Sequence, residues 1–163
     1  VLRFNFPYMA ERAIIGKKRP PDREPVLRPS WQAAVDLAGG PKGLIIGGRS
    51  MGGRIASMMA DELDVAGLIG LGYPFPPPGQ PEKLRTEHLK ELRTPTLILQ
   101  GERDPFGTEA EVESFALSDK ISIDWLTDGD HGFKPRKSSG VTLQQNLDAA
   151  LARIVEFVGG LKA

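Results

Sequence analysis

Three polar residues of this sequence have the side-chain types that nucleophilic catalysis requires, and each follows an apolar, strand-like segment. Ser50 lies at the centre of a G-x-S-x-G pattern over residues 48–52, between a predicted strand and a predicted helix. Asp104 and His131 each follow a later apolar segment. A serine hydroxyl becomes a nucleophile when a base takes its proton, and a carboxylate fixes the tautomer of a histidine base. The chain order Ser, Asp, His therefore predicts a nucleophile, an orienting acid and a general base.

The residues around Ser50 suit a sharp turn from a strand into a helix. Gly48 and Gly52 supply the small residues that such a turn needs. The helix that starts here directs its free N–H groups toward the serine, so the backbone N–H of Met51 is the expected oxyanion donor. Arg49 is a possible contact for an anionic substrate, with a solvated surface charge as the alternative.

Two further carboxylates compete with Asp104 for the role of orienting acid. Glu102 lies in the same loop, and Asp130 is the immediate neighbour of His131. Adjacent side chains tend to point away from each other, which makes Asp130 the weaker candidate. We favour Asp104 because its loop directly follows a predicted strand, and parallel sheets build their sites at the carboxyl ends of strands.

Two aromatic residues have both a functional and a structural interpretation, and one histidine has only a structural one. Tyr73 and Phe75 could line a substrate pocket, and the packing of two aromatic rings within a loop is the alternative. His88 lies in a charged, helix-like stretch, which predicts a histidine at the surface. Tyr73 and Phe75 are therefore possible substrate contacts, and His88 is not assigned to the site.

Composition excludes several classes of function. The 163 residues include no cysteine and two histidines, which excludes a cysteine nucleophile and argues against a multi-histidine metal site. The formal net charge is zero, without the basic footprint of a nucleic-acid-binding protein. The longest apolar run, residues 65–71, is too short to span a bilayer. The glycines near Ser50 do not form a dinucleotide-binding G-x-G-x-x-G. We therefore expect no metal, cofactor, nucleic-acid partner or membrane partner.

Apolar segments alternate with helix-like segments, which predicts an α/β fold with a mostly parallel sheet and helices on both faces. The expected strands are 1–6, 43–48, 65–71, 95–100 and 121–126. The expected helices are 31–38, 51–63, 86–92, 108–116 and 141–161. The first helix should begin at Ser30, after a long loop over Pro7–Pro29. The final helix should bury an apolar face formed by Leu143, Leu147, Leu151, Ile154, Val155 and Val158.

The whole chain resembles the α/β-hydrolases, most closely the dienelactone-hydrolase-like branch. Within that branch it is similar to predicted hydrolases related to testis-expressed and histone-acetyltransferase-complex subunits. The segments that carry the resemblance are 47–54, 99–105 and 129–133. The resemblance implies that the serine, aspartate and histidine above act as nucleophile, orienting acid and general base, without a cofactor.

The sequence departs from this family's pattern at its N-terminal end. The family opens with further strands, one of which ends in a His-Gly-type loop that supplies a second oxyanion N–H. No segment of this sequence matches that loop. In the family's strand order, the absent strand lies between the counterparts of 1–6 and 43–48. We therefore expect residues 1–163 to be a single α/β-hydrolase domain that lacks its N-terminal strands.

The leading hypothesis is a cytoplasmic serine hydrolase that cleaves a carboxylic ester or related acyl bond of a small molecule through an acyl-enzyme. The alternative is a catalytically idle hydrolase-fold domain that serves as an interaction module, because a fold does not guarantee activity. The missing oxyanion loop and the basic, proline-rich segment 12–28 favour the alternative. A Ser50 hydroxyl outside hydrogen-bond reach of His131 would favour it further.

Overall fold

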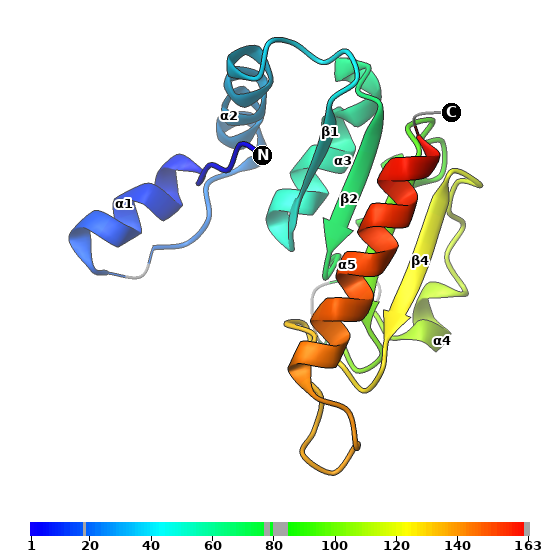
Figure 1. The fold of residues 1–163 in the computed structure, drawn as a ribbon. Helices are drawn as coiled ribbons and strands as arrows, with labels where there is room; N and C mark the ends of the chain where they lie inside the picture. The colour runs from blue at the N-terminus through cyan, green and yellow to red at the C-terminus, as the bar shows by residue number, and fades with distance from the viewer. Residues whose placement is uncertain (18, 77–78, 80–84, 162–163) are drawn as a thin grey trace.

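The predicted buried strands assemble into one sheet (Figure 1). The computed structural model describes residues 1–17, 19–76, 79 and 85–161, and within them lies a four-stranded sheet in the order β1-β2-β3-β4. The strands are β1 (Ile45–Arg49), β2 (Gly67–Leu71), β3 (Thr96–Gly101) and β4 (Ile121–Leu126). Each neighbouring pair is parallel, so all four carboxyl ends lie along one edge. The predicted α/β fold with a parallel sheet is confirmed.

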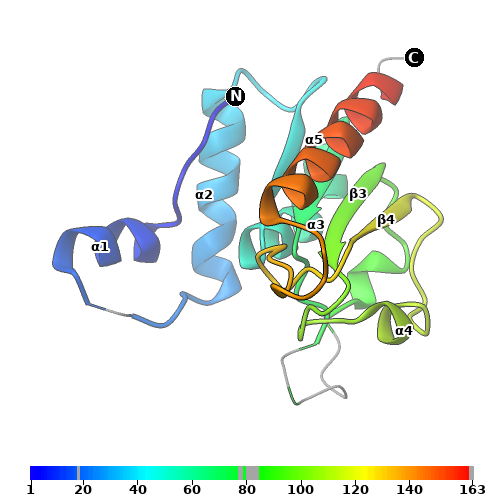
Figure 2. The ribbon, with the colours of Figure 1, turned by 60° about the horizontal axis from the view of Figure 1, so that its bottom comes forward.

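Helices cover both faces of this sheet (Figures 1 and 2). Helix α3 (Met51–Leu63) packs against β1 and β2, and α5 (Leu143–Gly160) packs against β3 and β4 on the opposite face. Helix α2 (Glu24–Leu37) lies on the outer side of α3. Two short elements replace longer predicted helices: η1 (Glu87–Leu89) is a single 3₁₀ turn, and α4 (Glu109–Val112) is one α-helical turn.

The N-terminal region contains helices where the sequence predicts a loop. The expected loop over Pro7–Pro29 includes α1 (Pro7–Ile15), and α2 begins at Glu24. Ser30 therefore lies inside α2 instead of capping it. Both helices have a proline in the first turn, where the missing N–H would have no intrahelical acceptor in any case. These prolines start helices, which is why a loop was the wrong prediction.

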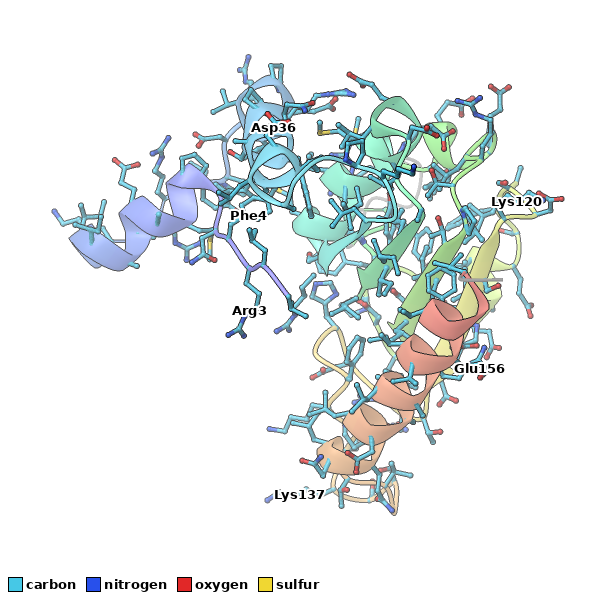
Figure 3. All side chains as sticks on the ribbon, turned by 45° about the horizontal axis from the view of Figure 1, so that its top comes forward. Arg3, Phe4, Asp36, Lys120, Lys137 and Glu156 are labelled. Atoms are coloured by element: carbon cyan, nitrogen blue, oxygen red, sulfur yellow. The ribbon has the colours of Figure 1, made fainter. Side chains whose placement is uncertain are left out.

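The predicted strand over residues 1–6 is also wrong. This segment has no regular secondary structure, and Phe4 lies against α2 (Figure 3). The rings of Phe4 and Trp31 meet edge-on, with 4.9 Å between their centroids. A strand needs a neighbour to satisfy its N–H and C=O groups, and within the described sheet β1 pairs only with β2. An apolar cavity of about 870 Å³ is lined by this segment and by β1. The family resemblance predicts a further strand at this position.

Helix α5 does not bury the apolar face that its sequence predicts. Asn146 and Ala150 are its buried residues, and Ile154 and Phe157 pack against the core. Four residues of the predicted face are between 40% and 63% exposed: Leu143, Leu147, Leu151 and Val155. Among the described elements, α5 makes most of its contacts with β3 and β4, and the face that carries these four residues stays exposed. None of the described helices is both long and apolar enough to cross a lipid bilayer.

Candidate active site

Ser50 forms the turn between β1 and α3 and has a strained backbone. Its φ of 51° and ψ of −119° lie in a region that residues with a side chain rarely adopt. Such strain costs about 1–3 kcal/mol and persists where the surrounding structure fixes it. The Ser50 N–H donates to the Leu71 carbonyl at 2.9 Å, and the Ser50 carbonyl accepts from the Arg54 N–H at 3.0 Å. Met51, the predicted oxyanion donor, is the first residue of α3.

Two glycines let β1 and α3 approach each other at this turn. A Cβ atom at Gly48 would lie 2.6 Å from the carbonyl carbon of Gly52, and one at Gly53 would lie 2.6 Å from the carbonyl oxygen of Gly48. Both positions therefore exclude a side chain. A Cβ atom at Gly52 would meet no atom within 4 Å. The packing thus depends on Gly48 and Gly53, and the sequence pattern around the serine did not single out Gly53.

Asp104 and His131 form a hydrogen-bonded pair at the same edge of the sheet. The Asp104 side chain is fully buried, and its Oδ2 atom lies 2.8 Å from His131 Nδ1. Its Oδ1 atom accepts a hydrogen bond from the Phe106 N–H at 2.9 Å. The rival carboxylates bind backbone N–H groups instead: Glu102 accepts from Asp128, and Asp130 accepts from residues 132 and 134. Of the three candidates, Asp104 is the one in contact with His131.

Polar contacts fix the loop that carries His131. The Asp128 carboxylate accepts hydrogen bonds from the backbone N–H and the guanidinium of Arg136. The side-chain bond to Arg136 is the largest influence on Asp128 and lowers the pKa of its carboxyl below the ordinary 3.8. From α5, Asn146 donates to two carbonyls of the loop, at 3.0 and 2.8 Å. Neither residue was predicted, because their partners are known only once the loop folds against α5.

Ser50 and His131 lie in neighbouring turns. The Leu71 carbonyl accepts the Ser50 N–H, and the next residue is Gly72. A Cβ atom at Gly72 would lie 2.9 Å from the His131 carbonyl oxygen. The Arg49 guanidinium reaches the same loop, 3.1 Å from the Cβ position of Gly132. Among the described contacts, the His131 ring bonds to its carboxylate partner and not to Ser50. The structure thus joins Asp104 to His131, and Ser50 lies in the adjoining turn without a described hydrogen bond to the ring.

Tyr73 and Phe75, the possible substrate contacts, are buried in the core. Their side chains are 1% and 0% exposed, and their ring centroids lie 4.9 Å apart. Phe75 also packs against Phe115, with 5.9 Å between ring centroids. In this structure both aromatic residues pack the interior beneath the sheet edge, which favours the packing alternative.

His88 is not the surface residue that the sequence predicts. Its Nε2 atom lies 2.8 Å from Ser57 Oγ and 3.2 Å from the Tyr73 hydroxyl. Burial, followed by the charge of Arg54, lowers the pKa of His88 from 6.5 to about 4. Burial also raises the pKa of Tyr73 to about 12. Both side chains are therefore uncharged at neutral pH, as a partly buried polar cluster requires.

A parallel sheet with a strained serine turn and a histidine bonded to a buried aspartate at its carboxyl edge matches a known class of protein. The sequence profile described as alpha/beta hydrolase domain matches residues 1–159. The chain therefore belongs to the alpha/beta hydrolase family.

Solved structures share the fold at low sequence identity. An alpha-beta serine hydrolase homologue from Coxiella burnetii matches with a TM-score of 0.61 and 17% identity, over 88% of this chain and 62% of that protein. A monoacylglycerol lipase from Paleococcus ferrophilus matches with a TM-score of 0.65 and 10% identity, over 87% of this chain and 77% of that protein. A serine hydrolase without lid from Xanthomonas campestris matches with a TM-score of 0.57 and 19% identity, over 82% of this chain and 56% of that protein. The chain thus spans less than two thirds of the length of the Coxiella and Xanthomonas proteins.

Proposed function

We propose that this protein is a serine hydrolase that cleaves a carboxylic ester or a related acyl bond of a small molecule, without a cofactor. The observation that carries the proposal is the 2.8 Å contact between Asp104 and His131 beside the strained turn at Ser50. A buried carboxylate on Nδ1 leaves Nε2 as the free ring nitrogen, which is the atom that a general base uses. We also infer that the chain lies in the dienelactone-hydrolase-like branch, which its serine, acid and base segments resemble.

The proposed reaction proceeds through an acyl-enzyme. Ser50 Oγ attacks the substrate carbonyl carbon while His131 Nε2 takes the hydroxyl proton, and Asp104 holds the resulting imidazolium. The Met51 N–H stabilises the oxyanion of the tetrahedral intermediate. The imidazolium then gives its proton to the leaving alcohol as the acyl bond breaks. Water, deprotonated by His131, attacks the acyl-enzyme, and the released acid leaves Ser50 with its proton restored.

A fluorophosphonate probe tests the nucleophile directly, because it reacts with a serine activated by a neighbouring base. The purified protein should be labelled, and the Ser50→Ala variant should not. Ser57→Ala is the matched control, since it removes a serine that also contacts a histidine. Labelling that survives in Ser50→Ala, or that is lost equally in Ser57→Ala, would contradict the assignment of Ser50.

The second candidate function is a catalytically idle interaction module. Two observations favour it: the absent hydrogen bond between Ser50 and His131 among the described contacts, and the exposed apolar side chains of α5. Hydrogen bonds at an active site are often completed only when substrate is bound, so the absent bond is also compatible with a hydrolase. A folded protein that the probe labels no faster than Ser50→Ala would favour the module.

A further inference from the structure

Gln100, at the carboxyl end of β3, has a fully buried side chain whose amide contacts the acid directly. Its Nε2 atom donates to Asp104 Oδ2 at 2.9 Å, and further carbonyl acceptors lie at 3.2 Å on Tyr73 and 3.3 Å on Gly107. Its Oε1 atom accepts from the Tyr73 N–H at 2.6 Å. Every hydrogen-bonding atom of this buried amide therefore has a partner, as burial of a polar group requires.

These partners allow only one orientation of the Gln100 amide. If the oxygen and nitrogen were exchanged, the amide N–H groups would face the N–H of Tyr73, and the amide oxygen would face the Asp104 carboxylate. Both contacts would be repulsive. The Tyr73 backbone thus determines which end of the amide faces the acid, and that end is a donor.

We propose that Gln100 is a positioning residue for the acid–base pair, an inference that rests on the proposed hydrolase function. Asp104 Oδ2 receives both Gln100 Nε2 and His131 Nδ1, while Oδ1 is held by a backbone N–H. A carboxylate held at both oxygens cannot rotate about its Cβ–Cγ bond. The neutral amide fixes the carboxylate without adding a charge that would compete with the imidazolium.

The chemistry of other side chains explains why an amide suits this position. An apolar residue of similar size would leave the Tyr73 N–H without its acceptor and would remove one donor from Asp104. A lysine or arginine would pair with Asp104 and draw it away from His131. A carboxylate would repel Asp104. Glutamine alone among these supplies a donor, an acceptor and no charge.

Two substitutions and one control separate positioning from general stability. Gln100→Leu removes the donor at similar size, and Gln100→Glu keeps size and shape. Thr96→Val is the matched control, because Thr96 is equally buried on β3 and its hydroxyl donates one 2.8 Å hydrogen bond far from Asp104. The rate of fluorophosphonate labelling should fall by about tenfold to a hundredfold in Gln100→Leu, as expected for a lost bond to a charged group. It should stay within about twofold in Thr96→Val.

The pH dependence of Gln100→Glu tests the contact between residue 100 and Asp104 through the labelling rate of the folded protein. Two adjacent carboxyl groups do not both ionise readily, so the introduced carboxyl keeps a proton at low pH and still donates to Asp104. As the pH rises this proton leaves, and two negative charges face each other. The labelling rate relative to the unchanged protein should therefore be nearly normal at low pH and decline at high pH. A ratio that does not change with pH would overturn the proposal.

A second measurement keeps this inference separate from the proposed function. The His131 Nδ1 proton can be followed by NMR in protein labelled with ¹⁵N-histidine. The chain has two histidines, so only two ring systems contribute signals. Exchange of this proton with water should be faster in Gln100→Leu than in Thr96→Val. Equal exchange rates would contradict the positioning role. If the unchanged protein is not labelled by the probe, the hydrolase proposal fails, and the exchange measurement still decides the role of Gln100.

Discussion

Two serine–histidine pairs within the described residues differ in the backbone strain of the serine and in the partner of the histidine. Ser57 and His88 are hydrogen-bonded at 2.8 Å, but Ser57 lies in the middle of α3 and is 2% exposed. Ser50 has no such bond, yet it occupies a strained turn beside His131, and that histidine has a carboxylate partner. Contact between a serine and a histidine is therefore a poor criterion for a catalytic site.

The position of the proton separates the two pairs further. Ser57 Oγ has one proton and three partners within reach: the Arg54 carbonyl at 2.7 Å, the Tyr73 hydroxyl at 2.8 Å and His88 Nε2 at 2.8 Å. The Arg54 carbonyl can only accept, so it competes with His88 for the Ser57 proton. A histidine with a pKa of about 4 would also be a weak base at neutral pH. This cluster joins α3 to η1 and to the segment after β2.

The largest expected effect follows from removing the carboxylate partner of His131, a feature that His88 does not have among the described contacts. Asp104→Asn is isosteric and can still accept from the Phe106 N–H. It removes the charge and presents an N–H or a neutral oxygen to His131, which no longer fixes the productive tautomer. We expect labelling to slow by about 10⁴-fold, as such a change does in a triad.

The control for this prediction is the thermal unfolding midpoint, which should change little because the two side chains have the same shape. Asp130→Asn tests the rival acid in the same assay and should leave the labelling rate within about twofold. A larger loss in Asp130→Asn than in Asp104→Asn would show that the assignment of the acid is wrong.

A smaller effect is expected from displacing His131 without altering its chemistry. A Cβ atom at Gly72, where φ is +63°, would lie 2.9 Å from the His131 carbonyl oxygen and 3.2 Å from Nδ1. Gly72→Ala should therefore move the ring and slow labelling by about tenfold to a hundredfold. Gly43→Ala is the matched control: φ is +72° there, and a Cβ atom would meet nothing within 4 Å.

Both alanine variants share the strain of a positive φ, about 1 kcal/mol of unfolding free energy. Only Gly72→Ala adds the contact with His131. Equal labelling rates in the two variants would show that the segment after β2 does not define the position of the base.

The local sequence pattern was sufficient to predict the elements and site residues that apolar spacing and chain order mark directly. Ser50, Asp104 and His131 each follow a strand, so their common edge could be predicted from apolar segments and chain order alone. Helix α3 was predicted with its observed bounds of Met51–Leu63 and β4 with its observed bounds of Ile121–Leu126, because apolar spacing marks both.

Partners that are distant in sequence could not be predicted. Gln100 lies in an apolar run, and only the folded chain shows that its amide meets Tyr73 and Asp104. His88 has charged neighbours in sequence, yet the 3₁₀ turn η1 directs its ring onto Ser57. The apolar spacing of α5 correctly predicted a helix, but it could not predict burial. Burial of the apolar face depends on which other elements pack against it.

The smallest effect, a difference in pH dependence, tests whether the His88 cluster is structural. His88 has a pKa of about 4 when folded, against an ordinary value of 6.5, so the folded protein resists its protonation. Between these values the unfolded chain binds a proton that the folded chain does not. The stability that the neutral His88 contributes is therefore fully present above pH 6.5 and is lost as the pH falls toward 4.

His88→Gln retains a polar partner for Ser57 but cannot titrate. In urea unfolding, its stability should decline less between pH 7 and pH 4 than that of the unchanged protein, while probe labelling at pH 7 stays within about twofold. His131→Gln should show the reverse. Labelling is lost, and the contribution of His88 to the decline of stability between pH 7 and pH 4 remains. Identical pH profiles of stability for His88→Gln and the unchanged protein would mean that His88 is solvated, as its sequence neighbours suggest. The contrast between the His88 pair and the proposed catalytic pair would then rest on Asp104 and the strained turn alone.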